Sequence, residues 1–371
     1  MPTQRYMRVG SKLVPLLGGG VELPYGSSTP PPVDPAPTDP TPDPAFTLGD
    51  TLPTKLNTGA RIDTVPYTGP GAGATLTVNT AGATYSGLDF GSTKVVVAAA
   101  DVSFTDCTWR NTKKLDGGLF QTVNATRCKI SFCTFENADQ SSFLSTGVVG
   151  QQFTMDRCQV IGFGDGVDPR ATTVGGNMAV TVRGSYIGEL GWWASPVVSY
   201  VHGGSTSYWT HNDAMQIAGG TGLTVVGNSI NGLYSTTVGT GTPNSGNEFT
   251  GDAKLYNQAD GEAKRREVVA VNANNTGGSL ACLMFNVVQG ANQQALVTDN
   301  WLGGGGIAVN ARDANTTGTV GTFLRNRLMH NQRYGDSSVI SVYRNGTAVL
   351  GTGADKNYFI DTGAEVFLEA F

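Results

Sequence analysis

A short segment recurs along most of the chain, and its spacing limits the folds that this sequence can adopt. In each copy a small or polar residue stands two positions before an apolar or aromatic residue, as in DCTWRN, FCTFEN, RCQVIG and GNSING. Successive copies lie 26, 25, 27, 43, 72, 26 and 31 residues apart. A period in the twenties is typical of repeat proteins, in which each copy stacks on the one before. The shared position is occupied by Cys107, Cys133, Cys158, Ser185, Asn228, Asn300, Asn326 and Asn357.

Each repeat also contains a second strand-like run, for example GGLFQTV, DAMQIAG or ACLMFNV. The chain has 51 glycines and only 14% charged residues, a composition that favours short strands and turns over long amphipathic helices. Two or three strands per repeat match one coil of a parallel β-solenoid, in which like residues stack about 4.8 Å apart. We interpret the 43-residue interval as one coil plus an excursion, and the 72-residue interval as two coils plus an excursion. The change from Cys and Ser to Asn at Asn228 indicates a change in how one bend is stabilised.

The coil pattern TxxxNxI/F, with its Asn column and inward Val, Ile and Phe, resembles the right-handed parallel β-helix of pectate-lyase-like proteins. The resemblance covers about residues 70 to 371. It implies an all-β fold, a single-stranded right-handed parallel β-helix preceded by an N-terminal extended segment. The handedness is taken from the resemblance alone.

Composition divides the chain into three parts. Residues 1–27 form a short segment with apolar and basic residues, and residues 47–371 carry the repeats. Between them, residues 28–46 hold eight prolines from Pro30 to Pro44. Proline at this density favours extended polyproline II, which at roughly 3.1 Å per residue spans about 45 Å. A disordered tail is the alternative, but the internal position favours a spacer.

This layout resembles that of minor tail proteins, fibres and spikes of tailed bacteriophages, especially those of actinobacterial hosts. The resemblance implies a homotrimer in the virion tail, attached to other tail proteins through residues 1–27 and touching a host cell-wall or envelope glycan. The expected function is therefore a structural tail component that presents a β-helix for host recognition. A purely structural tail protein, which contacts only other tail proteins, stays open as an alternative.

Charge, hydropathy and cysteine usage narrow the classes further. The net charge of -5 argues against a nucleic-acid partner, and no stretch approaches the 18 apolar residues of a membrane span. The N-terminus lacks a signal-peptide core, because VPLL is short and broken by Pro15, which predicts synthesis in the host cytoplasm. The five cysteines show no CxxC spacing, so we expect reduced, structural thiols.

The interval from Ser185 to Asn228 exceeds one coil by about seventeen residues, and this excess is rich in aromatic side chains. Solenoids place insertions on a lateral face, where exposed rings can stack on sugars. The alternative is that the rings pack against the coils or a neighbouring subunit. The candidate glycan- or partner-binding residues are Trp192, Trp193, Tyr200, His202, Tyr208 and Trp209.

An enzymatic alternative depends on two acidic spots. The HNDA tetrad, with His211 and Asp213, resembles a His-x-Asp-Ala/Gly pattern at strand starts in β-helix proteins, and an imidazole beside a carboxylate can act as a general base. A second spot, GFGDGVDPR, adds Asp165, Asp168 and Arg170. The simpler interpretation makes Asp213 a turn cap, His211 a surface residue, and the Asp-Gly and Asp-Pro pairs ordinary turns.

These residues would serve a polysaccharide depolymerase, either a glycoside hydrolase or a lyase. A hydrolase needs two carboxylates about 5 to 9.5 Å apart, and Asp165 or Asp168 lies within two coils of Asp213. A lyase would use Arg170 or a lysine as base, with Ca²⁺ on the acids. The sequence departs from both patterns, since it has neither acids on successive coils as in a lyase calcium site nor the GHG and RIK elements of polygalacturonase-type hydrolases. We therefore expect no cofactor and no metal, and favour binding over catalysis.

Overall fold

The protein is described from a computed structural model. It describes residues 5–9, 12–16, 46–69, 74–122, 125–139, 144–192, 200–202, 205–207, 213–232, 254–255, 281–286, 294–304, 307–311, 319–328, 340–342, 347–360 and 362–370.

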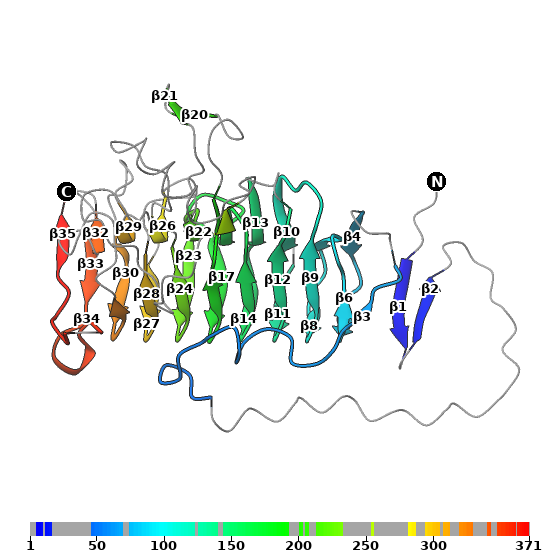
Figure 1. Ribbon diagram of the computed structural model, residues 1–371, viewed down its shortest axis with the longest axis horizontal. Coiled ribbons are helices and arrows are strands. Elements are labelled where there is room, and N and C mark those ends of the chain that lie inside the picture. The colour runs from blue at the N-terminus through cyan, green and yellow to red at the C-terminus, as the bar shows by residue number, and fades with distance from the viewer. Residues whose placement is uncertain are drawn as a thin grey trace, which may run out of the picture.

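Three long parallel sheets make up the body of the protein (Figure 1). The first sheet contains β4 (Thr75–Val78), β7 (Lys94–Val97), β10 (Gly117–Thr122), β13 (Ser145–Gly150), β16 (Asp165–Pro169), β22 (Asp213–Ile217), β26 (Ala281–Phe285), β29 (Ile307–Ala311), β32 (Ile340–Val342) and β35 (Leu368–Ala370). The second contains β5 (Thr84–Ser86), β8 (Ser103–Thr105), β11 (Cys128–Ser131), β14 (Phe153–Asp156), β17 (Asn177–Arg183), β23 (Thr221–Val226), β27 (Ala295–Thr298), β30 (Thr319–Leu324) and β33 (Thr347–Leu350). The third contains β3 (Val65–Pro66), β6 (Leu88–Asp89), β9 (Thr108–Asn111), β12 (Thr134–Asn137), β15 (Gln159–Ile161), β18 (Tyr186–Gly188), β24 (Ser229–Asn231), β28 (Trp301–Gly303), β31 (Arg327–Leu328) and β34 (Tyr358–Phe359).

The chain visits the three sheets in a fixed order, so each passage through them is one coil. Coil 1 consists of β4, β5 and β6, coil 2 of β7, β8 and β9, and the order continues to coil 9, which consists of β32, β33 and β34. Neighbouring coils pair in parallel, and equivalent positions face each other, as in Ile130↔Met155 of the second sheet and Phe135↔Val160 of the third. The register shifts once in the β17–β23 pair and once in the β30–β33 pair. This architecture confirms the predicted all-β parallel β-helix.

The predicted column lies at the edge where second-sheet strands end and third-sheet strands begin, which we call the ladder edge. The N–H of Cys158 donates to Ser185 Oγ on the next coil at 3.0 Å, and the N–H of Ser185 donates to Asn228 Oδ1 at 2.9 Å. The ladder continues from the N–H of Asn228 to Asn300 Oδ1, also at 2.9 Å. The column therefore ties each backbone to a side chain of the following coil.

The 72-residue interval was interpreted wrongly. Because β24 pairs directly with β28 and Asn228 contacts Asn300, this interval is one coil plus an insertion, not two coils. The 43-residue interval is one coil plus an excursion, as predicted, because β18 pairs with β24. Coil count and insertion length add to the same sequence interval, so spacing alone could not separate them.

The interior is filled by inward side chains stacked from coil to coil. Phe90, Trp109 and Phe135 lie on one another at 4.6 Å per step in coils 1 to 3. In later coils the same third-sheet position carries Ile230, Leu302 and other aliphatic residues. All five cysteines are buried and free, which confirms the predicted structural thiols.

A hairpin near the N-terminus and one helical turn are among the elements that lie outside the three long sheets. Residues 5–9 (β1) and 12–16 (β2) form an antiparallel hairpin within the N-terminal segment that we predicted only as extended. The only helical turn among the described residues is η2 (Gly353–Asp355). In that part of the chain no helix is long and apolar enough to cross a membrane. Residues 28–45 of the predicted spacer lie outside the described residues.

Candidate functional site

Long connections gather at the edge where third-sheet strands end and first-sheet strands begin, which we call the insertion edge. Residues 189–212 leave this edge after coil 5, residues 232–280 leave it after coil 6, and residues 329–339 leave it after coil 8. At the ladder edge, by contrast, two residues suffice to connect β14 to β15. The longest connections thus leave the coils at one edge, and the first of these insertions is the one that the sequence analysis predicted.

Strand pairing joins the first two insertions to each other. β19 (Gly191–Trp192) follows coil 5 and pairs in parallel with β25 (Lys254–Leu255), which belongs to the insertion after coil 6. A small antiparallel hairpin, β20 (Tyr200–His202) with β21 (Ser205–Ser207), stands off the same side of the molecule in Figure 1. The described parts of the two insertions are therefore joined by one short pair of strands.

Two of the predicted acidic residues occupy adjacent coils at this edge. Asp165 begins β16 and Asp213 begins β22, and the N–H of Asp213 donates to Asp165 Oδ1 at 3.0 Å. One coil further, the N–H of Ala281 donates to Asp213 Oδ1 at 2.9 Å. Asp213 is fully buried, whereas Asp165 keeps partial solvent contact. These carboxyls make a short ladder of their own, parallel to the one at the ladder edge.

Burial changes the acid–base properties of this pair. It raises the pKa of Asp165 to about 7, although the Asp213 N–H and the charge of Arg170 act in the opposite direction. Burial also raises the pKa of Asp213 well above its ordinary value, and the neighbouring charge of Asp165 raises it further. Two like charges on adjacent coils are costly in a dry environment, so the pair retains at least one proton near neutral pH.

Asp168 and Arg170 form a second charged group beside this pair. The buried Asp168 carboxylate makes an ion pair with Arg170, whose Nε donates to Asp168 Oδ1 at 3.1 Å. Burial lowers the pKa of Arg170, and the charge of Asp165 opposes that change. Asp165 thus contacts Asp213 and is influenced by the charge of Arg170, which itself binds Asp168. A catalytic role for these residues stays a prediction. The expected turns at Asp165 and Asp168 are wrong, because both residues lie within β16 and its neighbours supply the backbone partners of a strand.

The positions next to the Asp165 and Asp213 carboxyls are occupied by a column of small residues that pack closely from coil to coil. A Cβ atom on Gly166 would lie 2.4 Å from the carbonyl oxygen of Ala214, and one on Gly147 would lie 2.6 Å from that of Gly166. Cys282 occupies the next coil, and its Sγ donates to the Gly303 carbonyl at 2.6 Å. Burial raises the pKa of this thiol to about 12, so it is inert. Sequence analysis missed this small-residue column, although the positions directly after Asp165 and Asp213 hold Gly and Ala.

Two buried acceptors on coil 6 have no hydrogen-bond partner within the described part of the chain. They are Asp213 Oδ2, at the start of β22, and Asn231 Oδ1, at the end of β24. Buried polar atoms nearly always have a partner, so an unpaired one calls for an explanation. Both belong to the coil that lies between the two long insertions, which makes this part of the insertion edge the candidate site.

The remaining predicted residues are only partly described. Trp192 lies in β19, and Tyr200 and His202 lie in β20, with their side chains outside the described residues. Trp193, Tyr208, Trp209 and His211 also lie outside the described residues. The glycan-binding and general-base roles of these side chains stay predictions. Among the described side chains no three His, Cys, Asp or Glu are grouped as metal ligands would be.

Comparison with protein-family models, with curated proteins and with solved structures found no match in any of the three. The resemblance to phage tail proteins and to pectate-lyase-like proteins therefore stays a prediction from the sequence.

Proposed function

We propose that the protein is a structural component of a phage tail that presents a parallel β-helix and binds a host envelope glycan along its insertion edge. The observation that carries this proposal is the joining of two long insertions, beside coils 5 and 6, at one lateral edge of an otherwise regular solenoid. Binding residues concentrate on connections held by a rigid scaffold. The stacked coils supply that scaffold.

The chemistry of the insertion edge suits a sugar chain. Six aromatic or imidazole side chains occur between Trp192 and Trp209, and rings of this kind stack on the apolar faces of sugars. The acceptors Asp213 Oδ2 and Asn231 Oδ1, on the coil between the insertions, are buried, so the proposal assigns the glycan contacts to the ring side chains and not to these two atoms. Attachment through residues 1–27 and a homotrimer are part of the same proposal, since several copies would raise avidity.

A depolymerase is the second candidate, and the Asp165–Asp213 pair favours it. A carboxyl that keeps its proton near neutral pH beside a second carboxyl is the pairing that glycoside hydrolases use for acid and base. Against it, one oxygen of each carboxyl already accepts a backbone N–H from the next coil, and Asp213 is fully buried. These contacts give the pair a structural role, and adhesion therefore ranks first.

One experiment separates the candidates. The purified chain is incubated with insoluble cell walls of an actinobacterium, the walls are sedimented, and both the bound fraction and new reducing or unsaturated ends are measured. Binding without new ends, lost in a variant with Trp192→Ala and Trp193→Ala, supports the proposal. The matched control is Leu56→Ala, which truncates a side chain that is 98% exposed outside the insertion edge.

The other outcomes name the alternatives. New ends that disappear in Asp213→Asn identify a depolymerase, because the amide keeps an acceptor for the Ala281 N–H but cannot exchange a proton as a carboxyl does. If the protein neither binds nor cleaves the walls, the proposal is overturned in favour of a purely structural tail protein.

A further inference from the structure

Residues 46–66 run outside the coils, lengthwise along the ladder edge, as the blue trace beneath the sheets in Figure 1 shows. Near the start of this segment, Gly49 lies against Asp299 of coil 7. Further on, the N–H of Gly59 donates to the Arg157 carbonyl of coil 4 at 2.9 Å. The segment ends at coil 1, where β3 pairs with β6. We call residues 46–66 the strap.

Alternating arginine and phenylalanine side chains hold the strap to the middle of this path. The guanidinium of Arg61 lies 3.4 Å from the ring centre of Phe132, and that of Arg157 lies 4.4 Å from the same ring. Arg157 also covers Phe46, at 4.9 Å. Phe46 and Arg61 belong to the strap and the other two residues to the coils, so the four side chains interleave.

An ion pair fixes the strap one coil nearer the N-terminal end. Arg61 donates from Nε and Nη2 to the two oxygens of Asp106, at 2.9 and 2.8 Å. The backbone N–H of Arg61 donates to the same carboxylate at 3.1 Å. Asp106 is buried by this contact, at 5% exposed, and a two-pronged ion pair of this geometry is stronger than a single surface pair.

The residue type at each bend under the strap suits the part of the strap that it contacts. Phe132 has φ 52°, a left-handed conformation that is costly for a bulky residue, and its ring is in contact with Arg61 of the strap and Arg157 of coil 4. Where the strap backbone itself crosses, the bends carry Gly184 and Gly227. A Cβ on Gly227 would lie 2.8 Å from the backbone nitrogen of Gly49, and one on Gly184 would lie 3.1 Å from the Phe46 ring.

From these contacts we infer that the strap attaches the preceding chain to the side of the β-helix, at its ladder edge. We call this attachment the mount. The chain that arrives at Phe46 meets the β-helix at coils 4 and 5 instead of at its first coil. The third-sheet strands run from the ladder edge to the insertion edge, so the mount and the candidate site lie at opposite ends of the same strands. A tail-anchored N-terminal segment would therefore hold the insertion edge away from the mount. Only this last consequence rests on the proposed function; the strap itself does not.

Paired nitroxide labels test the mount through distance distributions measured by pulsed electron resonance. Thr47→Cys is combined with Thr84→Cys of coil 1 or with Val349→Cys of coil 9, all three exposed, while the five native cysteines are buried and do not label. With coils about 4.8 Å apart, a docked strap places Thr47 roughly 20 Å from either label. Both distributions should be narrow. A broad Thr47–Thr84 distribution in the native chain overturns the inference.

A variant pair tests the side chains that hold the strap. In Arg61→Ala with Phe132→Ala, both distributions should broaden while the circular dichroism of the coils stays native. The matched control is Arg127→Ala, which removes a two-pronged ion pair with Asp101 between the first and second sheets, remote from the strap. If the distance distributions stay narrow in the double variant, the arginine and phenylalanine contacts do not hold the strap, and that part of the inference is overturned. Because none of these readouts uses cell walls, failure of glycan binding would leave this result intact.

Discussion

Coils 2 to 4 and coils 6 to 9 stabilise the same bend, at the ladder edge, with different side chains. The early bends carry Cys107, Cys133 and Cys158, and the later bends carry asparagines. The N–H of Cys133 reaches Cys158 Sγ at 3.5 Å, a weak acceptor, whereas the N–H of Asn228 reaches an amide oxygen at 2.9 Å. Both forms build the same coil. The stack therefore tolerates a change of bonding strength along its length.

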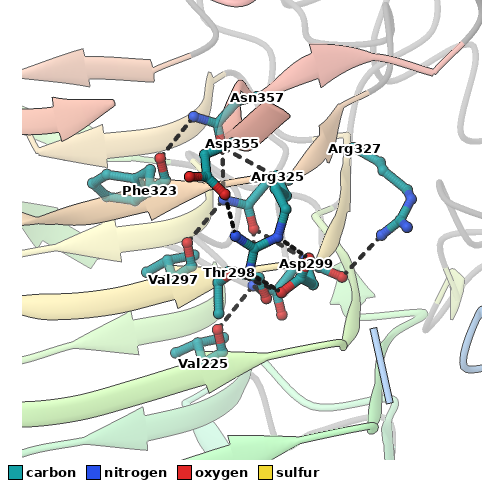
Figure 2. A network of polar contacts seen from close by, with 11 residues as sticks. Val225, Val297, Thr298, Asp299, Phe323, Arg325, Arg327, Asp355 and Asn357 are labelled. Atoms are coloured by element: carbon teal, nitrogen blue, oxygen red, sulfur yellow. Dashed lines mark hydrogen bonds and ion pairs between the residues drawn. The ribbon is translucent and has the colours of Figure 1, made fainter. Parts of the chain in front are cut away.

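The asparagine side chains also donate to the preceding coil, over shorter distances than the cysteine thiols do. Asn300 Nδ2 donates to the carbonyl of Val225 on the preceding coil at 2.9 Å, and Asn357 Nδ2 does the same to Phe323 at 2.8 Å. Figure 2 shows this amide ladder with its carbonyl partners. The thiols of Cys107 and Cys158 reach the equivalent carbonyls of Tyr85 and Ile130 at 3.6 and 3.4 Å, and Cys133 Sγ donates within its own coil to Ser131 at 3.3 Å. A thiol is the weaker donor.

The strap compensates where the ladder is weak. Its charged and aromatic contacts fall on Asp106, Phe132 and Arg157, and each of these residues directly precedes a cysteine of the column. The last coils use a bridge of their own. Arg325 of coil 8 binds Asp299 of coil 7 at 2.8 Å and also Asp355 of coil 9, as Figure 2 shows. External clamps thus support both halves, with a long strap on one and a single arginine on the other.

The largest difference in stability between the cysteine half (coils 2 to 4) and the asparagine half (coils 6 to 9) is expected when one side chain of the column is removed from each. Asn300→Ala deletes the acceptor for the Asn228 N–H and the donor to Val225, and leaves buried polar groups unpaired. Their loss should reduce the free energy of unfolding by about 3–5 kcal/mol, against about 1 kcal/mol for Cys158→Ala. Urea unfolding followed by circular dichroism measures both. Equal losses would contradict the difference in ladder strength.

The Asp165–Asp213 pair should make the free energy of unfolding fall as the pH rises. The asparagine ladder has no titrating group and should add no such dependence. Because the pKa of both Asp165 and Asp213 is raised in the folded protein, the folded state binds more protons than the unfolded chain. The resulting stabilisation is complete below about pH 4 and is lost as the pH rises through about 7. The loss should be about 2 kcal/mol, allowing for the solvent contact of Asp165.

The measurement is the free energy of unfolding at several pH values in the native chain and in Asp213→Asn. The variant should show a flatter profile, because one titrating group and its repulsion with Asp165 are gone. Asn300→Gln serves as a control with no titrating group, and its profile should run parallel to that of the native chain. A native profile that rises from pH 4 to 7 would contradict the raised pKa of the pair.

Removing the strap contact should affect the cysteine half more than the asparagine half. Arg61→Ala deletes the ion pair with Asp106 and the contact with Phe132, and should lower stability by about 1–2 kcal/mol. Hydrogen exchange should rise at Gly59 and Arg61 and in coils 2 to 4, with coils 7 to 9 unchanged. Uniform exchange changes along the whole stack would show that the strap does not act locally.

The arginine bridge of the last coils should give the smallest effect. The Arg325 side chain is 41% exposed, so its ion pairs are screened by solvent. Arg325→Met should lower stability by about 0.5 kcal/mol, and about 1 M salt should remove most of the difference between the two proteins. Thermal unfolding at low and high salt measures it. A loss as large as that of Asn300→Ala would make the bridge, not the ladder, the main support of these coils.

The repeated column made the fold predictable, because a residue that must face the same bend on every coil leaves a period in the sequence. Cys158, Ser185 and Asn228 carry that signal and do form consecutive rungs. The strap carries no such signal. Its residues have no period, and Arg61 finds its partner Asp106 45 residues away through the fold alone.

The candidate site was predictable in part for the same reason. Asp165 and Asp213 were expected within two coils of each other and lie on adjacent ones. Local patterns misled at Asp168-Pro169, since a dipeptide common in turns lies here in a strand whose partners come from other coils. The unpaired oxygens of Asp213 and Asn231 have no signature in sequence at all, because only packing decides which buried atom lacks a partner.

The strap also sets an order of events during synthesis. Gly49 leaves the ribosome long before Asp299, which it contacts 250 residues later in the chain. At about 5–20 residues per second, this end of the strap waits on the order of tens of seconds for the coil it must touch. The other end of the strap has its partners much sooner, because Arg61 contacts Asp106 of coil 2 and Phe132 of coil 3. The strap can therefore dock from its Arg61 end first, and its Gly49 end follows only when coil 7 has been made.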